Sequence, residues 1–280
     1  MIGSISAELF LLRKRAATWI LLGIWTALAA FFAYILPYVS YRNETNTPDR
    51  FREDLVDLLP QSIVANVLGG FPFFGGVLVL ILGALTLGSE YGWGTLKTLF
   101  TQRPVRLNVF AAKLVALGIW LIPFVVLSFA VGAIASYLIA RAEDASVDWP
   151  SAWLIVRGLA AAWLIMAVWA ALGVLLGVLS RGTALAIGIG IIYGLVIEGL
   201  ISALLDQVDV LSSLIKALLR ANAYSLIAVL GTSTSDISGN GPGSFSGPFV
   251  GGVQSVLVLA LYLAAFVAIA ATVLQRRDVS

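Results

Sequence analysis

Residues 151–204 read SAWLIVRGLAAAWLIMAVWAALGVLLGVLSRGTALAIGIGIIYGLVIEGLISAL, two long apolar runs separated by a short polar turn. A helix needs about 20 apolar residues to cross the hydrocarbon core of a bilayer, and each run is of that order. Neither run alternates apolar and polar residues, as the strands of a membrane barrel do. Ser180-Arg181-Gly182-Thr183 leaves room only for a tight turn. The stretch therefore predicts two adjacent membrane-spanning helices, at residues 151–179 and 184–204.

The composition extends this prediction to the whole chain. Its 280 residues are 60% hydrophobic and 11% charged, with a mean hydropathy of +0.99. A soluble domain is about half apolar and about a quarter charged. A bilayer accommodates the excess because apolar side chains can face lipid, provided that the spanning backbone satisfies its own hydrogen bonds. We expect an all-α, polytopic membrane protein with a single transmembrane domain over residues 1–280.

Four further apolar runs bring the predicted number of spans to six, and they cover residues 17–37, 73–88, 109–140 and 253–274. Pro123 predicts a kink in the third span, because proline removes one backbone hydrogen bond. Asp148-Trp149-Pro150-Ser151 is a helix-start pattern ahead of the fourth. Residues 1–15 predict a helix lying in the membrane interface or, alternatively, the beginning of span one itself.

The charges predict which side of the membrane holds the termini. Six spans place both termini on one side. With the termini inside, the inner segments carry ten basic and three acidic residues, a net charge of +7. The outer segments carry seven basic and eleven acidic residues, a net charge of −4, and Glu198 within span five supplies the remainder. Since Lys and Arg accumulate on the cytoplasmic side, we expect cytoplasmic termini.

The residues that the chain lacks exclude several chemistries. It has no cysteine and no histidine, so disulfides, thiolates and the commonest metal ligand are missing. No Gly-x-x-x-x-Gly-Lys-Ser/Thr phosphate loop occurs, so nucleotide binding would come from a partner. One acidic residue lies within the predicted spans, so a two-aspartate intramembrane enzyme is unsupported. We predict no catalytic residue, no metal, no cofactor bound by this chain and no nucleic-acid partner.

The most distinctive segment lies in the loop 89–108, between spans two and three, and reads Ser89-Glu90-Tyr91-Gly92-Trp93-Gly94-Thr95-Leu96-Lys97-Thr98-Leu99-Phe100. A short helix there would present aromatic side chains beside charges, a combination that suits a protein interface. Trp and Tyr also favour the headgroup level of a bilayer, so the segment could equally be an interfacial anchor. The residues alone leave both interpretations open.

This segment, followed by Arg103-Pro104-Val105-Arg106, resembles the first cytoplasmic loop of type-2 ABC transporter permeases. The chain is most similar to the small six-span bacterial permeases associated with self-resistance to antibiotic peptides and with drug export. The Arg276-Arg277-Asp278-Val279 ending, the N-terminal interfacial helix and the chain length are similar too. In residues the resemblance rests on the loop and the tail, and in layout it covers the whole chain.

The resemblance implies a permease subunit of an ATP-driven exporter in the bacterial cytoplasmic membrane. Its loop would be a coupling helix that docks onto a separate ATPase subunit, which binds ATP and Mg²⁺, through Glu90, Tyr91, Gly92, Trp93, Gly94, Thr95, Leu96 and Lys97. The turn at Arg181 would be a second, smaller contact. The resemblance also implies a permease dimer with the substrate path at its interface, and short re-entrant helices within the outer region 205–252. The substrate would be a drug, an antimicrobial peptide or a lipid-like compound.

A second constellation lies inside the spans. Glu198 and Arg157 each lie about 9–10 Å below the outer boundary, counted at 1.5 Å per residue, on spans joined by a tight turn. Because an unpaired charge in a span is costly, we predict a Glu198–Arg157 pair. Such a Glu198 could line a path for a cationic substrate or carry a proton, and alternatively the pair could be purely structural.

Two weaker patterns complete the sequence. Gly173-xxx-Gly177 and Gly190-xxx-Gly194 predict close helix contacts, most simply within the chain. The Gly- and Ser-rich residues 231–252 predict a flexible linker or, alternatively, a gate at the outer exit. A non-ABC transporter, a channel subunit or a membrane scaffold is the alternative functional class, although no span shows the polar stripe of a channel.

Overall fold

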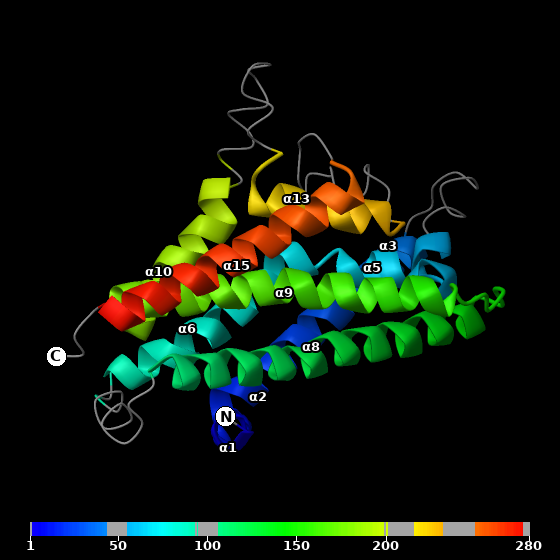
Figure 1. The fold of residues 1–280 in the computed structure, drawn as a ribbon. Helices are drawn as coiled ribbons and strands as arrows, with labels where there is room; N and C mark the ends of the chain where they lie inside the picture. Colours follow the sequence, from blue (N-terminus) through cyan, green and yellow to red (C-terminus); the bar gives the residue numbers. More distant parts are fainter. Residues whose placement is uncertain are drawn as a thin grey trace.

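The computed structural model describes residues 2–43, 55–92, 94, 106–198, 200, 216–231 and 250–276. Throughout these residues the regular structure is helical, and Figure 1 shows long helices side by side in a bundle. Five of the helical runs are long and apolar enough to cross a membrane. The chain is therefore a helical, multi-pass membrane protein, as its composition predicted.

The N-terminal region contains a short helix and the first candidate span. α1 (Ile2–Lys14) packs against α8, and the chain turns at Arg15 into a new helix. The span, Ala16–Asn43, consists of α2 (Ala16–Ala30), the π-helical η1 (Phe31–Ile35) and α3 (Leu36–Asn43). α1 is thus a helix of its own rather than the beginning of span one.

The second candidate span, Pro60–Gly92, begins earlier than predicted. It consists of η2 (Pro60–Ser62), α5 (Ile63–Leu68), the π-helical η3 (Phe71–Gly75) and α6 (Gly76–Gly92). Gly69, Gly70 and Pro72, which favour a break in a helix, lie within this run. A hydrogen bond from Gly75 N to Gly70 O, at 3.1 Å, carries the helical path past Pro72.

The third and fourth candidate spans are α8 (Arg106–Ala142), which contains Pro123, and α9 (Ala152–Ser180). The predicted start of α9 is confirmed, because Oγ of Ser151 accepts a hydrogen bond from Leu154 N at 3.3 Å. The predicted turn is confirmed too. Arg181 takes a left-handed φ of 52°, and α10 (Thr183–Ile191) begins directly after Gly182.

The fifth predicted span is described only in part. α10 continues into the π-helical η4 (Ile192–Ile197), and beyond Glu198 only Leu200 of that span is described. Farther along, α13 (Leu219–Val229) packs against α15 (Gly252–Arg276), the last candidate span, and also against α5, α9 and η3. Arg220 of α13 is only 5% exposed.

α9 is the centre of the bundle. It packs against α6, α8, α10 and α15, and Figure 1 shows it between α15 and α8. Glycine permits the close approach to α6, because a Cβ on Gly173 would collide with the backbone of Leu80 and Ala84. The other glycines of the two predicted patterns also lie against atoms of this chain: Gly177, Gly190 and Gly194. Both patterns therefore serve packing within the chain.

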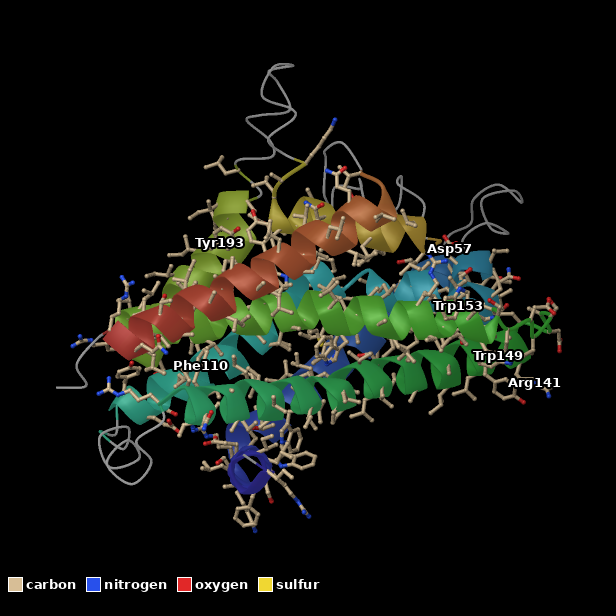
Figure 2. The ribbon with its side chains drawn as sticks, in the orientation of Figure 1. Asp57, Phe110, Arg141, Trp149, Trp153 and Tyr193 are labelled. Atoms are coloured by element: carbon tan, nitrogen blue, oxygen red, sulfur yellow. The ribbon has the colours of Figure 1, made fainter. Side chains whose placement is uncertain are left out.

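The two ends of the bundle carry different residues. One end, called the loop end here, holds the end of α6, the start of α8, the 180–183 turn and the end of α15. Figure 2 shows Arg141, Trp149 and Trp153 gathered at the opposite end, away from Phe110 near the start of α8. Trp149 and Trp153 are both exposed.

Candidate functional site

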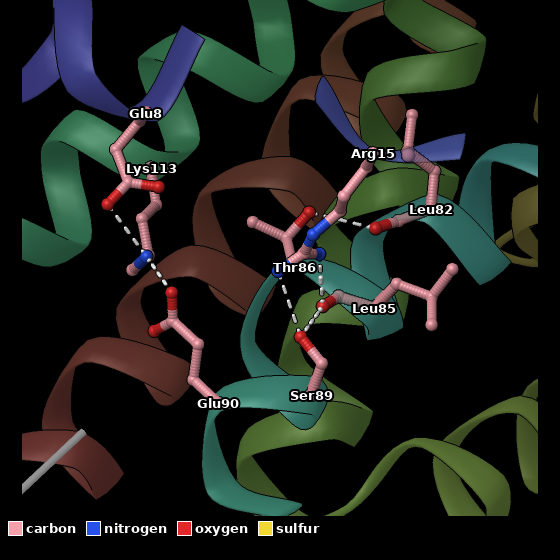
Figure 3. Close-up of polar contacts among 8 residues, drawn as sticks. All are labelled: Glu8, Arg15, Leu82, Leu85, Thr86, Ser89, Glu90 and Lys113. Atoms are coloured by element: carbon pink, nitrogen blue, oxygen red, sulfur yellow. Dashed lines mark hydrogen bonds and ion pairs between the residues drawn. The ribbon is translucent and has the colours of Figure 1, made fainter. Parts of the chain in front are cut away.

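A buried ion-pair cluster lies at the loop end, where the chain leaves α6 and enters α8 (Figure 3). The side chain of Lys113 on α8 is 1% exposed. Its Nζ donates to Oε1 of Glu8 at 2.8 Å and to Oε1 of Glu90 at 2.5 Å. Glu8 belongs to α1 and Glu90 lies near the end of α6. One ammonium group therefore connects three helices.

Arg15 adds a second positive charge from the turn between α1 and α2. Its guanidinium donates to Leu85 O at 2.7 Å and to Oγ of Ser89 at 3.0 Å. Burial lowers the pKa of Arg15, and the carboxylates of Glu90 and Glu8 oppose that shift. We call Glu8, Arg15, Glu90 and Lys113 the loop-base cluster. Its two carboxylates face one ammonium and one guanidinium, so the cluster is electrically neutral.

The position of α1 brings the cluster together. Lys113 lies about two helical turns into α8, and α1 lies against the same helix. Nε1 of Trp120 donates to Leu9 O at 3.5 Å, and the Trp19 and Trp120 rings meet edge to face at 5.6 Å. These contacts hold Glu8 beside Lys113. Removing one partner of a buried ion pair costs about 3–5 kcal/mol, so the cluster fixes both ends of the loop as one unit.

The structure describes part of the predicted coupling segment. Glu90 lies in the loop-base cluster, Tyr91 packs against the hydrophobic core and Gly92 ends α6. Gly94 has a φ of 67°, a left-handed conformation that glycine adopts without strain. The remaining predicted coupling residues lie outside the described residues: Trp93, Thr95, Leu96 and Lys97.

The turn at Arg181 lies beside the base of the loop. A Cβ on Gly88 of α6 would meet backbone atoms of Gly182 at 3.0 Å, so the turn packs directly on α6 just before Ser89 and Glu90. The described start of the segment that resembles a coupling helix and the turn at Arg181 therefore both lie at the loop end of the bundle.

The predicted Glu198–Arg157 pair does not form, and this prediction is wrong. Glu198 is 1% exposed, and its carboxylate accepts hydrogen bonds from the Tyr193 hydroxyl at 2.6 Å, Leu219 N at 3.1 Å and Arg220 N at 2.9 Å. The start of α13 supplies two backbone donors and a partial positive charge, which satisfy a carboxylate without an ion pair. Arg157 is exposed near the start of α9.

The side chain of Arg220 also belongs to this second site, which we call the Glu198 site. Its guanidinium lies over the rings of Phe73, at 5.6 Å, and Tyr224, at 5.7 Å. Its Nη1 also donates to Gly194 O at 3.4 Å. The Glu198 site thus attaches α13 to η3 and η4. Across the described residues, no group of three or more Asp and Glu side chains could hold a metal ion.

Sequence reasoning missed the partners of Glu90. Lys113 carried a usable signal, because it is an ionisable residue inside the predicted span 109–140, where a charge requires a partner. Glu8 and Arg15 carried no comparable signal, since their part in the cluster depends on how α1 folds back onto α8.

Comparison of the sequence with known proteins assigns the chain to a family. The chain matches no curated protein. The family model described as a protein of unknown function, DUF2705, matches residues 20–280, which include Glu90, Lys113 and the Glu198 site. The chain belongs to the DUF2705 family.

Proposed function

We propose that the chain is the membrane-spanning permease subunit of an ABC exporter driven by a separate ATPase subunit. The loop-base cluster is the observation that carries this proposal. Lys113 joins α1, α6 and α8 at the two ends of the loop that resembles a coupling helix. A force on that loop would reach the three helices together, because separating the buried charges is costly.

Six spans and cytoplasmic termini complete the proposed topology, with α10 and η4 as the beginning of the fifth span. The exposed Trp149 and Trp153 suggest that the opposite end lies at a bilayer interface, because Trp favours the headgroup level on either side. The charges support the sidedness. At the loop end, Glu8 and Glu90 are outnumbered by the basic residues Arg13, Lys14, Arg15, Arg106, Lys113, Arg181 and Arg276. The loop then faces the cytoplasm, where the ATPase subunit binds.

The proposed functional unit contains two permease chains and two ATPase subunits, with the substrate path between the permeases. A drug, an antimicrobial peptide or a lipid-like compound is the proposed substrate. Every contact of the Glu198 carboxylate described above is made by a tyrosine hydroxyl or the start of α13. This supports the structural interpretation of Glu198 over a role in binding a cationic substrate.

Co-purification tests the proposal. The tagged chain is purified from its native host in mild detergent, and the proteins that accompany it are identified by mass spectrometry. We expect a nucleotide-binding ATPase subunit with the wild type. The double variant Trp93→Ala/Leu96→Glu should lose that subunit, because it alters the proposed docking surface.

Trp149→Ala/Ala152→Glu is the matched control, with the same kinds of substitution three residues apart at the opposite end of the bundle. It should retain the ATPase subunit. If a folded wild-type chain brings no ATPase subunit with it, the proposal is wrong, and an ion-driven transporter, a channel or a scaffold becomes the better account. Equal loss in both double variants would also count against docking through this loop.

A further inference from the structure

An apolar groove of about 480 Å³ opens on the side of the bundle between α8, α9 and α15. α8 contributes Leu114, Gly118 and Ile122, α9 contributes Trp163 and α15 contributes Leu263. The indole N–H of Trp163 already donates to Gly118 O at 2.9 Å. Since all the lining residues are apolar, the groove suits a hydrocarbon chain rather than a polar ligand.

Two arginines lie where α8 and α15 meet at the loop end. Nη1 of Arg106 donates to Leu274 O at 3.5 Å, which joins the start of α8 to the end of α15. Arg276 is exposed two residues beyond Leu274. Neither α8 nor α15 contains an acidic residue. Arg106 and Arg276 thus place two positive charges near the end of the groove that is closest to the loop.

The part of the groove near Leu114 lies at the depth of lipid tails below these arginines. Counted along α8 at 1.5 Å per residue, Leu114 is about 12 Å and Ile122 about 24 Å from Arg106. The hydrocarbon core of one leaflet is about 15 Å thick, half of the bilayer core. Leu114 lies within that thickness and Ile122 beyond it, so a lipid with its phosphate at Arg106 and Arg276 would place the far part of an acyl chain in the part of the groove near Leu114.

We infer that the groove binds an acyl chain of an anionic phospholipid from the leaflet at the loop end, with its phosphate held by Arg106 and Arg276. Guanidinium groups bind phosphate oxygens through parallel N–H···O hydrogen bonds, and these bonds would position the headgroup. The apolar groove would bind and position the acyl chain. This lipid site is independent of the proposed transport function.

Native mass spectrometry of the purified full-length chain tests the headgroup. The probes are phosphatidylglycerol and phosphatidylcholine with the same acyl chains. We expect the wild type to bind phosphatidylglycerol more tightly. Arg106→Gln and Arg276→Gln should each weaken that binding about fivefold, the effect of one basic residue near an anionic lipid surface. Arg13→Gln, which removes an exposed charge from α1, should leave it unchanged.

A second pair of variants tests the tail. Val115 lines the groove and is 44% exposed, and Val126 is 49% exposed on the same helix outside the groove. Val115→Trp should fill the groove and lower the binding of both lipids, whereas Val126→Trp should bind them like the wild type. Thermal unfolding of each variant confirms that it is folded.

Three results would overturn the inference. They are equal lipid binding by the two tryptophan variants, no preference for phosphatidylglycerol in the wild type, and efficient cross-linking between two copies of Val115→Cys in membranes. The last result would show that a second copy covers the groove. It can be read directly, because the native chain contains no cysteine.

Discussion

The loop-base cluster and the Glu198 site each bury a carboxylate, and they satisfy it in different ways. Glu90 and Glu8 both form ion pairs with the ammonium of Lys113, so opposite charges join three helices. Glu198 accepts hydrogen bonds from the Tyr193 hydroxyl and from two backbone N–H groups of α13, and the Arg220 guanidinium acts on it through its charge without a direct ion pair. The first arrangement joins helices that are distant in the sequence, and the second holds one short helix in place.

The two arrangements suit different roles, because the first can transmit movement between helices and the second anchors one helix. A displacement at either end of the 89–108 loop would pull on α1, α6 and α8 together, because the loop-base cluster resists separation. The Glu198 site restrains α13 locally, and the contacts described above link it to η3 and η4 rather than to the loop-base cluster. We therefore expect substitutions in both regions to lower the stability of the protein, with the larger loss in the loop-base cluster. We expect coupling to the proposed ATPase subunit to depend on the loop-base cluster and not on the Glu198 site.

The largest expected effect is that of Lys113→Leu. It leaves Glu8 and Glu90 without their shared ammonium, and we expect the free energy of unfolding to fall by about 3–5 kcal/mol. Reversible unfolding in mixed micelles measures the loss. The triple variant Glu8→Gln/Glu90→Gln/Lys113→Leu should recover most of it, because the uncompensated charges are gone. If the triple variant is no more stable than Lys113→Leu, unpaired charge is not the cause.

Glu198→Leu comes next. It removes the acceptor of two buried N–H groups at the start of α13, and we expect a loss of about 2–4 kcal/mol. Glu198→Gln should lose less, because its amide oxygen still accepts. Amide hydrogen exchange at Leu219 and Arg220 provides the local readout and should accelerate in Glu198→Leu. Unchanged exchange at both amides would show that the carboxylate does not hold α13.

The close packing between α6 and α9 provides an independent reference for the stability losses expected at these two sites. A Cβ on Gly173 would collide with backbone atoms of α6, so Gly173→Ala should cost about 1–3 kcal/mol. Gly188→Ala is the matched control, because no atom lies within 4 Å of its added Cβ. The control should gain stability, since alanine favours a helix over glycine. Equal thermal stabilities for the two variants would contradict the close packing.

The smallest expected effect is that of Arg157→Gln. Arg157 is exposed and makes no contact with the Glu198 carboxylate, so its removal should change the free energy of unfolding by less than about 0.5 kcal/mol. The same unfolding assay checks this value. A loss as large as that of Glu198→Leu would revive the ion pair that the structure replaces.

Much of the fold could be predicted because a bilayer restricts the alternatives. The 180–183 turn and the start of α9 at Ser151 follow from local chemistry, and both are confirmed. The start of the second span could not be predicted in the same way. Glycine and proline at 69–72 indicate a break, but a π-type hydrogen bond to Gly70 O keeps that region helical. Such a bond is not visible in the local residue pattern.

The sites were predictable only in part, and for a related reason. Burial of Glu198 within a span correctly indicates that it needs partners, yet those partners are backbone groups of a helix that begins at Leu219. Backbone donors leave no signature in side-chain composition. Glu90 could be singled out from its loop, whereas its link to Glu8 depends on the path of α1 across α8.

The most direct test of this account compares matched substitutions in the two regions. Glu90→Gln and Glu198→Gln each replace one buried carboxylate by an amide, and Lys113 keeps Glu8 as a partner in the first variant. The amount of ATPase subunit that co-purifies with each folded variant is measured against the wild type. Our account predicts that Glu90→Gln lowers this amount and that Glu198→Gln leaves it unchanged. Equal amounts in the two variants, or a larger loss with Glu198→Gln, would contradict the role of the loop-base cluster in coupling.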